Sequence, residues 1–155
     1  MPIRLRPMRW WDIERVAPVE QELFAGDPPW TAEQFWSELA GVPGSRWYVV
    51  AEDGEHLAGY AGLSVPNQAG EPADIQTIAV LPERQRRGIG TLLLDALIDE
   101  AIRREAGELM LEVRADNEPA QRLYATHGFT RIAVRRHYYG RGRDGLVLRR
   151  RLGRR

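Results

Sequence analysis

The sequence contains no cysteine and no lysine among its 155 residues. Without cysteine, a disulfide framework, a thiolate metal site and a cysteine nucleophile are all excluded. The three histidines, His56, His127 and His137, are too scattered along the chain to indicate a zinc site. The sequence therefore predicts no metal site.

Long apolar runs are also missing. No stretch approaches the roughly 20 apolar residues that span a bilayer, and residues 1–16 lack the apolar core of a signal peptide. We therefore expect a cytoplasmic protein with no membrane partner. The hydrophobic content of 43% and the charged content of 28% are ordinary for a globular chain, and 155 residues fit one domain, residues 1–155.

The formal net charge of zero conceals an uneven distribution of charge. Residues 131–155 contain ten arginines and one acid, Asp144, whereas residues 1–130 contain 12 arginines and 21 acids. A basic end suits an RNA-rich neighbourhood. A solvated surface combined with codon bias toward arginine explains the pattern more simply, so no direct contact with nucleic acid is required.

Hydrophobic periodicity predicts a single series of strands and helices, without an internal repeat or linker. Strands are expected at 3–6, 47–52, 57–65, 74–80, 108–113, 129–136 and 146–152. Helices are expected at 11–23, at a short segment beginning near Thr31, and at 90–104 and 117–127. This order predicts an α+β fold in which helices cover both faces of one sheet.

Several local signals mark the helix ends. Thr31 and Gln34 fit a capping box, and Trp30 and Phe35 fit the hydrophobic staple that accompanies it. Gly107 is expected to cap the end of the helix at 90–104. The first helix carries Trp11 at the start of its apolar stripe, so Trp11 is expected to contribute to the buried face.

The most informative segment is QTIAVLPERQRRGIGT, from Gln76 to Thr91. A strand ends there, a turn with proline follows, and the pattern Q-x-x-G-x-G leads directly into an amphipathic helix. Glycines at 88 and 90 lack Cβ atoms, which lets a ligand approach the backbone closely. The N–H groups and dipole of the helix suit a pyrophosphate. Neither a P-loop nor a strand followed by G-x-G-x-x-G is present, and a tight turn before a helix is the purely structural alternative.

This segment resembles the acetyl-CoA pyrophosphate loop of the GNAT family of N-acetyltransferases, and the order of elements matches that family over essentially the whole chain. The resemblance implies acetyl-CoA as co-substrate and a mixed sheet that is splayed at its centre. It also implies a backbone N–H donor for the acetyl oxygen at Val80. The cofactor-binding residues that it implies are Ile78, Ala79, Val80, Arg86, Arg87, Gly88, Ile89, Gly90, Thr91 and Asn117.

A second set of motifs comprises LEVRADN at 111–117, LY at 123–124, HGF at 127–129 and RRHYY at 135–139. Together they resemble the RimI-type bacterial members, which acetylate the N-terminal alanine of a small-subunit ribosomal protein. The resemblance implies a protein N-terminus as acceptor, bound by Trp30, Tyr138 and Tyr139. The chain departs from the common pattern at Leu81 and Thr91, where Asp and a basic residue are frequent, and His137 replaces an Asn found in some relatives.

Two residues are candidates for proton transfer during direct acetyl transfer. Glu112, at the end of a predicted central strand, is the candidate base that acts through water, and Tyr124 is the candidate acid for the departing thiolate. The structural alternatives are a carboxylate paired with an arginine such as Arg114, and a core tyrosine on an amphipathic helix. Asn117 fits both a helix cap and a cofactor contact.

Other functions remain open on the same fold. A small-molecule amine acetyltransferase would keep the cofactor loop but would need no peptide groove. Acetylation of lysine side chains is a further possibility. A non-catalytic acetyl-CoA-binding or ribosome-binding module would suit the basic end of the chain, but the presence of both Glu112 and Tyr124 counts against it.

Overall fold

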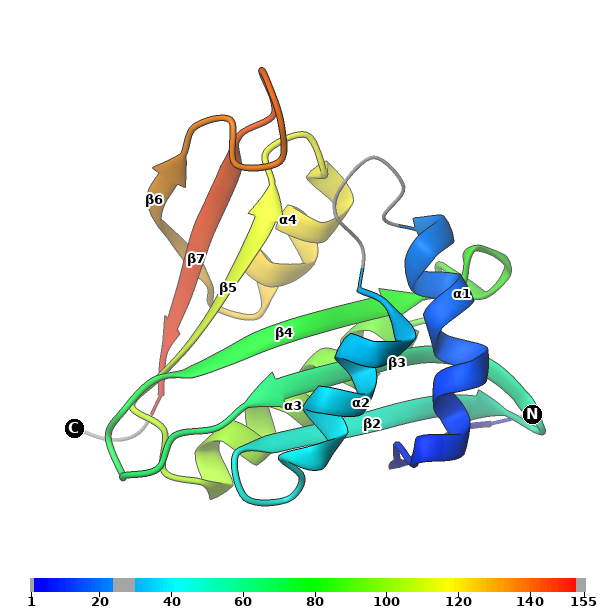
Figure 1. The fold of residues 1–155 in the computed structure, drawn as a ribbon. Helices are drawn as coiled ribbons and strands as arrows, with labels where there is room; N and C mark the ends of the chain where they lie inside the picture. Colours follow the sequence, from blue (N-terminus) through cyan, green and yellow to red (C-terminus); the bar gives the residue numbers. More distant parts are fainter. Residues whose placement is uncertain (1, 24–29, 153–155) are drawn as a thin grey trace.

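The computed structural model describes residues 2–23 and 30–152, and it contains a seven-stranded sheet with helices on both faces (Figure 1). The strands are β1 (Ile3–Pro7), β2 (Arg46–Asp53), β3 (His56–Ser64), β4 (Ala73–Val80), β5 (Glu108–Arg114), β6 (Thr130–Arg135) and β7 (Gly145–Arg151). The helices are α1 (Ile13–Leu23), α2 (Ala32–Ala40), α3 (Ile89–Arg103) and α4 (Glu118–Thr126), and the short 3-10 turns are η1 (Trp10–Asp12) and η2 (Pro82–Arg84). The predicted class and order of elements are confirmed. Within the described ranges, no helix is long and apolar enough to cross a membrane.

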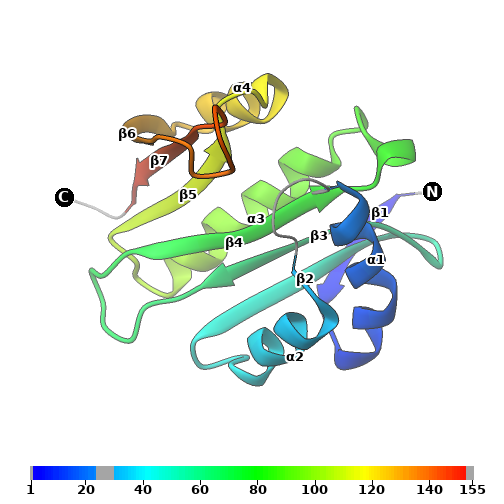
Figure 2. The ribbon, with the colours of Figure 1, turned by 45° about the horizontal axis from the view of Figure 1, so that its top comes forward.

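The sheet opens at its centre. Its order is β1-β2-β3-β4-β5-β7-β6, and only the central pair, β4 and β5, runs parallel. These two strands are paired only where Ala73 and Asp74 meet Leu109 and Met110, at the beginning of both strands. Beyond that point the strands diverge, as both views show (Figures 1 and 2). The predicted splay is therefore confirmed, and it leaves backbone groups of β4 and β5 without a strand partner.

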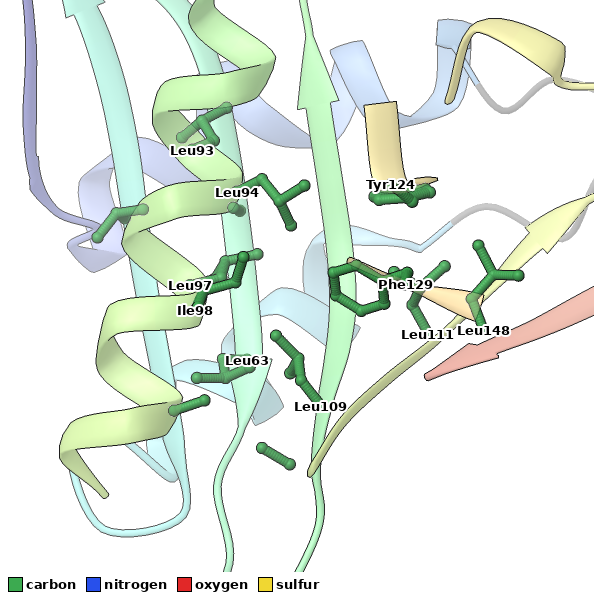
Figure 3. Packing of buried hydrophobic residues seen from close by; sticks show 14 of the residues in the cluster. Leu63, Leu93, Leu94, Leu97, Ile98, Leu109, Leu111, Tyr124, Phe129 and Leu148 are labelled. Carbon is green, nitrogen blue, oxygen red and sulfur yellow. The ribbon is translucent and has the colours of Figure 1, made fainter. Parts of the chain in front are cut away.

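One face of the sheet is covered by α3 and α4 (Figure 3). Most of the apolar stripe of α3 is buried, with Leu93, Leu94 and Leu97 fully inaccessible to solvent, but Ile102, which the spacing also placed on it, is 48% exposed. Burying each leucine side chain contributes about 1.5–3 kcal/mol. This face fixes α3 against β3 and β5 and therefore fixes the loop that precedes α3.

The other face is covered by α1 and α2. Leu23 at the end of α1 and Trp30 before α2 line the central opening. Thr31 and Gln34 form the predicted capping box, with hydrogen bonds of 2.8 and 3.2 Å. The staple is also confirmed, since the rings of Trp30 and Phe35 are 5.3 Å apart. The prediction for Trp11 is wrong, because this residue lies in the turn η1 before α1 and its side chain is 55% exposed.

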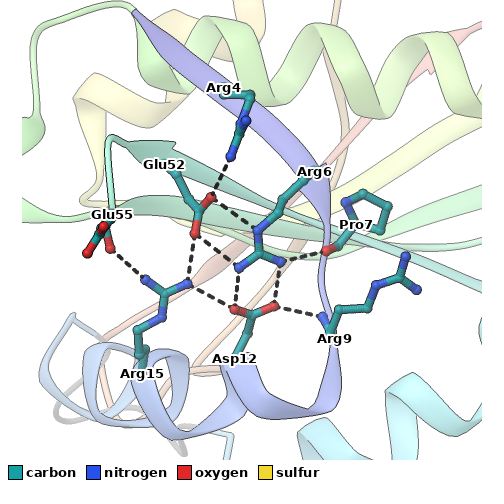
Figure 4. A network of polar contacts seen from close by, with 8 residues as sticks. All are labelled: Arg4, Arg6, Pro7, Arg9, Asp12, Arg15, Glu52 and Glu55. Carbon is teal, nitrogen blue, oxygen red and sulfur yellow. Dashed lines mark hydrogen bonds and ion pairs between the residues drawn. The ribbon is translucent and has the colours of Figure 1, made fainter. Parts of the chain in front are cut away.

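A charged network ties β1, η1, α1 and β2 together (Figure 4). Asp12 is fully buried, and its carboxylate accepts hydrogen bonds of 2.6 and 2.9 Å from Arg6 and 2.9 Å from Arg15. Both arginines also bind Glu52, at 3.0 and 3.1 Å. Burial alone would raise the pKa of Asp12, but Arg6, the Arg9 backbone N–H and Arg15 hold it below its usual value. The network anchors the first helix, which leads to the central opening.

The predicted cap at Gly107 is wrong. Helix α3 is capped by Arg104, and Glu105 takes the left-handed conformation at a φ of +61°. Gly107 instead lets the backbone of Gly70 pack closely against it, because a Cβ atom at position 107 would lie 2.3 Å from the carbonyl oxygen of Gly70. The glycine thus lets the β3–β4 connection pack against the start of β5.

Candidate active site

A cleft of about 1080 Å³ lies at the opening between β4 and β5. Its walls come from α1, β4, β5, α4, β6 and β7, from Trp30 and from the connection after β6. The structure brings seven of the predicted site residues into its lining: Trp30, Ile78, Glu112, Asn117, Tyr124, Tyr138 and Tyr139. The other predicted residues do not line this cleft: Ala79, Val80, Arg86, Arg87, Gly88, Ile89, Gly90 and Thr91.

Glu112 lies on β5 with its side chain 26% exposed. Its carboxylate accepts a hydrogen bond of 2.9 Å from Arg135 Nη1. The expected alternative partner, Arg114, binds Asp116 instead, through hydrogen bonds of 3.0 and 2.8 Å. The ion pair with Arg135 orients the carboxylate while leaving part of it open to the cleft.

Tyr124 projects from α4, and only 6% of its surface is exposed. Its ring packs edge-on against Phe129, with the ring centres 5.8 Å apart (Figure 3). Burial raises the pKa of the Tyr124 phenol, and the nearby Tyr139 raises it further. The hydroxyl therefore keeps its proton throughout the neutral and mildly basic range, which suits a proton donor.

Asn117 begins α4, and both interpretations of this residue are compatible with the structure. Its side-chain oxygen accepts a hydrogen bond of 3.2 Å from Ala120 N, which caps the helix. The same residue lines the cleft. The cap fixes the orientation of α4 and, with it, the position of Tyr124.

The glycine-rich loop lies beyond the end of β4, at the N-terminus of α3. Gly88 is the N-cap in the left-handed conformation, with a φ of +79°, and a Cβ atom there would meet no other atom within 4 Å. Arg86, Arg87 and Thr91 are exposed, whereas Ile89 is buried in the core. At Ile89, therefore, a ligand could contact the backbone but not the side chain.

Gly90 has a different environment. A Cβ atom at this position would lie 3.4 Å from Leu123 Cδ2 and 3.9 Å from Val80 Cγ2. The start of α3 therefore lies beside Leu123 of α4, the residue before Tyr124, and a Cβ atom at position 90 would make ordinary van der Waals contact there. The loop and the cleft are joined through this contact.

Aromatic side chains form the opposite wall. Tyr138 is 47% exposed, and its ring meets that of Tyr139 edge-on at 5.0 Å. The guanidinium of Arg135 lies 4.3 Å from the centre of the Tyr138 ring. Gly145 lets both tyrosines pack on β7, because a Cβ atom there would lie 3.1 Å from Tyr139 and 3.3 Å from Tyr138. Trp30, held by its staple, faces the same cleft.

Sequence reasoning did not predict five charged residues of the cleft lining as site residues: Glu20, Asp74, Arg114, Asp116 and Arg135. Burial and then the charge of Glu112 raise the pKa of Asp74. Glu20 is 4% exposed and accepts hydrogen bonds from Tyr60 and Thr77. A signal for Glu20 existed, because it follows Ile13 and Val16 at the spacing of the buried helical stripe. Nothing in the sequence paired Arg135 with Glu112.

Comparisons with known proteins agree with this geometry. The model of the acetyltransferase (GNAT) family matches residues 8–129. The chain is 40% identical over 151 residues to the N-alpha-acetyltransferase RimI of Mycobacterium tuberculosis (strain ATCC 25618 / H37Rv), an alignment that covers 96% of this chain and 92% of that protein.

Solved structures share the fold. The crystal structure of the ribosomal-protein-S18-alanine N-acetyltransferase from Escherichia coli superposes with a TM-score of 0.84 at 28% identity, covering 99% of this chain and 96% of that one. The structure of yncA, a putative acetyltransferase from Salmonella typhimurium with its cofactor acetyl-CoA, gives a TM-score of 0.81 at 21% identity, covering 99% and 95%.

Proposed function

Because the chain belongs to the GNAT family of acetyltransferases and is an acetyl-CoA-dependent N-acetyltransferase, we propose that its acceptor is the α-amino group of a protein N-terminus. An alanine-starting ribosomal protein is the favoured substrate, by analogy with the names of the relatives. The observation that carries the proposal is that Glu112 and Tyr124, from two different elements, line one cleft together with the aromatic wall.

The loop before α3 fits the pyrophosphate of acetyl-CoA. Open space at the left-handed Gly88 allows a ligand to approach the backbone. The first N–H groups of α3 and the exposed Arg86 and Arg87 supply positive potential. When bound, acetyl-CoA supplies the activated acetyl group, and Ile78, Ala79 and Val80 would flank its pantetheine arm. The Val80 N–H would stabilise the negative charge that develops on the acetyl oxygen.

Glu112 would take the proton of the attacking amine through an ordered water. An α-amine titrates near pH 8, roughly two to three units below a lysine side chain, so its deprotonation costs about 3 kcal/mol less. A carboxylate acting through water is therefore a sufficient base. Arg135 would keep that carboxylate oriented toward the cleft.

Tyr124 would act at the other end of the reaction. As the nitrogen–carbon bond forms and the carbon–sulfur bond breaks, the leaving thiolate needs a proton, which the Tyr124 hydroxyl would donate. The raised pKa of this buried phenol keeps it protonated before the transfer. Solvent would then return a proton to Tyr124 and remove one from Glu112, which restores both groups.

A competition between acceptors tests the proposal. Purified protein is incubated with acetyl-CoA and an equimolar mixture of an alanine-starting peptide, the same peptide with a blocked N-terminus and an internal lysine, and a polyamine. Mass spectrometry with fragmentation then locates the acetyl group. We expect acetylation at the α-amine of the alanine-starting peptide. Preferential labelling of the lysine side chain or of the polyamine would contradict the proposal.

A further inference from the structure

A buried carboxylate that the proposed chemistry does not use lines the cleft on its α1 side. Glu20 is 4% exposed, yet it contributes to the cleft lining. Its Oε1 atom accepts hydrogen bonds of 2.8 Å from the Tyr60 hydroxyl and 3.3 Å from the Thr77 hydroxyl. The backbone of Trp30 also lies close enough to Glu20 to lower its pKa. Glu20 therefore connects α1, β3, β4 and the acceptor wall.

Among the described residues, no positively charged side chain is bound to Glu20. Every hydrogen bond that it accepts from a described residue comes from a neutral donor, and none of the described arginines forms an ion pair with it. A buried carboxylate without a cation is costly in free energy. Burial correspondingly raises the pKa of Glu20. A cationic ligand that entered the cleft would supply the missing charge.

The position of Glu20 matches the place where an acceptor amine has to arrive. Its partner Thr77 precedes Ile78 on β4, in the part of the strand that has already separated from β5. Asp74, by contrast, lies where the two strands are still paired. The carboxylates of Glu112 and Asp116 are already bound by Arg135 and Arg114, respectively. Glu20 is thus the cleft carboxylate best placed to receive a new cation.

We propose that Glu20 binds the ammonium form of the acceptor's N-terminus and positions it in the cleft before its proton passes to Glu112 through water. This inference rests on the proposed function, because it assigns the acceptor side of the same cleft. It makes Glu20 a determinant of specificity, which favours acceptors that carry a free charged amine over uncharged molecules of the same shape.

The test compares two probes that differ only in the amine. One is a short alanine-starting peptide, and the other is its des-amino analogue, in which a propionyl group replaces the N-terminal alanine. Calorimetry measures the affinity of each for the enzyme–coenzyme A complex at about pH 6.5, where the α-amine is charged. We expect the wild-type protein to prefer the amine by on the order of tenfold to a hundredfold, the range that a hydrogen bond between charged groups supplies.

Glu20→Gln should reduce this preference to about twofold or less while leaving coenzyme A affinity unchanged, which also shows that the variant is folded. Glu22→Gln is the matched control, because Glu22 is exposed on the same helix, and it should keep the wild-type preference. Tyr60→Phe removes a hydrogen bond to Glu20 but retains the carboxylate, so it should keep the preference as well.

A Glu20→Gln variant that retains the full preference would overturn the inference. The inference would also be overturned if Glu20→Gln and Tyr60→Phe each lowered the affinity for both probes equally. Glu20 would then have only a structural role in the cleft wall. Failure of the wild-type protein to acetylate the alanine-starting peptide is a separate outcome. That result would remove the proposed function and the inference with it, so the two failures are distinguishable.

Discussion

Arg135 reaches across β7 to Glu112, and its Nη1 atom lies 2.9 Å from Glu112 Oε2. The same guanidinium lies 4.3 Å from the centre of the Tyr138 ring. One arginine on the edge strand therefore holds both the candidate base and part of the acceptor wall. This contact connects the two halves of the proposed site.

The Glu112–Arg135 pair should behave as one unit. Arg135→Gln should lower kcat/KM because the Glu112 carboxylate loses its orientation. The double variant Glu112→Gln/Arg135→Gln should be about as slow as Glu112→Gln alone. Steady-state rates on an alanine-starting peptide measure this coupling. Arg149→Gln is the control, since Arg149 pairs with Glu108 on β5 at 3.6 Å, and it should remain near wild type. Fully additive losses in the double variant would show that Arg135 does not act through Glu112.

Gly88→Ala should weaken acetyl-CoA binding by about tenfold or more, equivalent to about 1.4 kcal/mol, because the new methyl group enters space that the ligand occupies. Its positive φ adds a stability cost on the order of 1 kcal/mol. Gly70→Ala separates the two effects. Gly70 also has a positive φ and open space around a Cβ atom, but it lies near the opposite end of α3.

Calorimetry and thermal melts on both glycine variants give the comparison. We expect a similar loss of stability in the two proteins and a loss of acetyl-CoA affinity in Gly88→Ala alone. Unchanged affinity in Gly88→Ala would remove the loop from the binding site.

The buried network around Asp12 should dominate the acid sensitivity of the fold. The pKa values of Asp12 and Glu52 are lowered in the folded protein. Their contribution is therefore complete above the unfolded values of about 3.9 and 4.3, and it is lost as the pH falls through the lower folded values. Asp12→Asn leaves Arg6 without one of its partners and should cost about 3 kcal/mol at neutral pH.

Urea unfolding from about pH 7 down to about pH 2.5, a range that brackets these carboxyl groups, measures the effect. The Asp12→Asn protein should lose less stability on acidification than the wild type. Asp99→Asn, at an exposed position of α3, should follow the wild-type curve. Parallel curves for Asp12→Asn and the wild type would contradict the assignment.

Tyr124→Phe should lower kcat by roughly 100-fold with little change in Tm, because the ring that packs on Phe129 is retained. Tyr48→Phe should show the opposite pattern. The Tyr48 hydroxyl donates a 2.7 Å hydrogen bond to Glu38 away from the cleft lining, and its loss should cost about 1 kcal/mol of stability without affecting turnover. A Tyr124→Phe protein with normal kcat would return Tyr124 to a structural role.

Features that depend on residues close together in the sequence could be predicted, whereas contacts between distant segments could not. The capping box at Thr31 and the apolar stripe of α3 involve neighbours three or four residues apart, so periodicity and local motifs identified them. The cleft residues Glu112 and Tyr124 were found because they stand inside recognisable motifs.

Contacts between distant segments were not accessible in this way. The partner of Glu112 depends on β7 lying between β5 and β6, which no local pattern encodes, so the nearer Arg114 was the natural candidate. Gly107 followed a helix and resembled a cap, but its role is set by the approach of Gly70 from another connection. Glu20 lies on the buried stripe of α1, but its hydrogen bonds to Tyr60 and Thr77 involve strands distant in sequence and could not be predicted.

Whether Glu112 accepts the amine proton in this cleft is decided by the pH dependence of the Glu112→Gln variant. Values of kcat on one alanine-starting peptide are measured from about pH 6.5 to about 9.5, a range that brackets the α-amine titration. The variant should be strongly impaired at neutral pH and should recover part of its rate as the pH rises, because the free amine becomes abundant. Tyr124→Phe should show no recovery over the same range, since a high pH supplies no acid. Profiles for both variants that match the wild type would contradict the account.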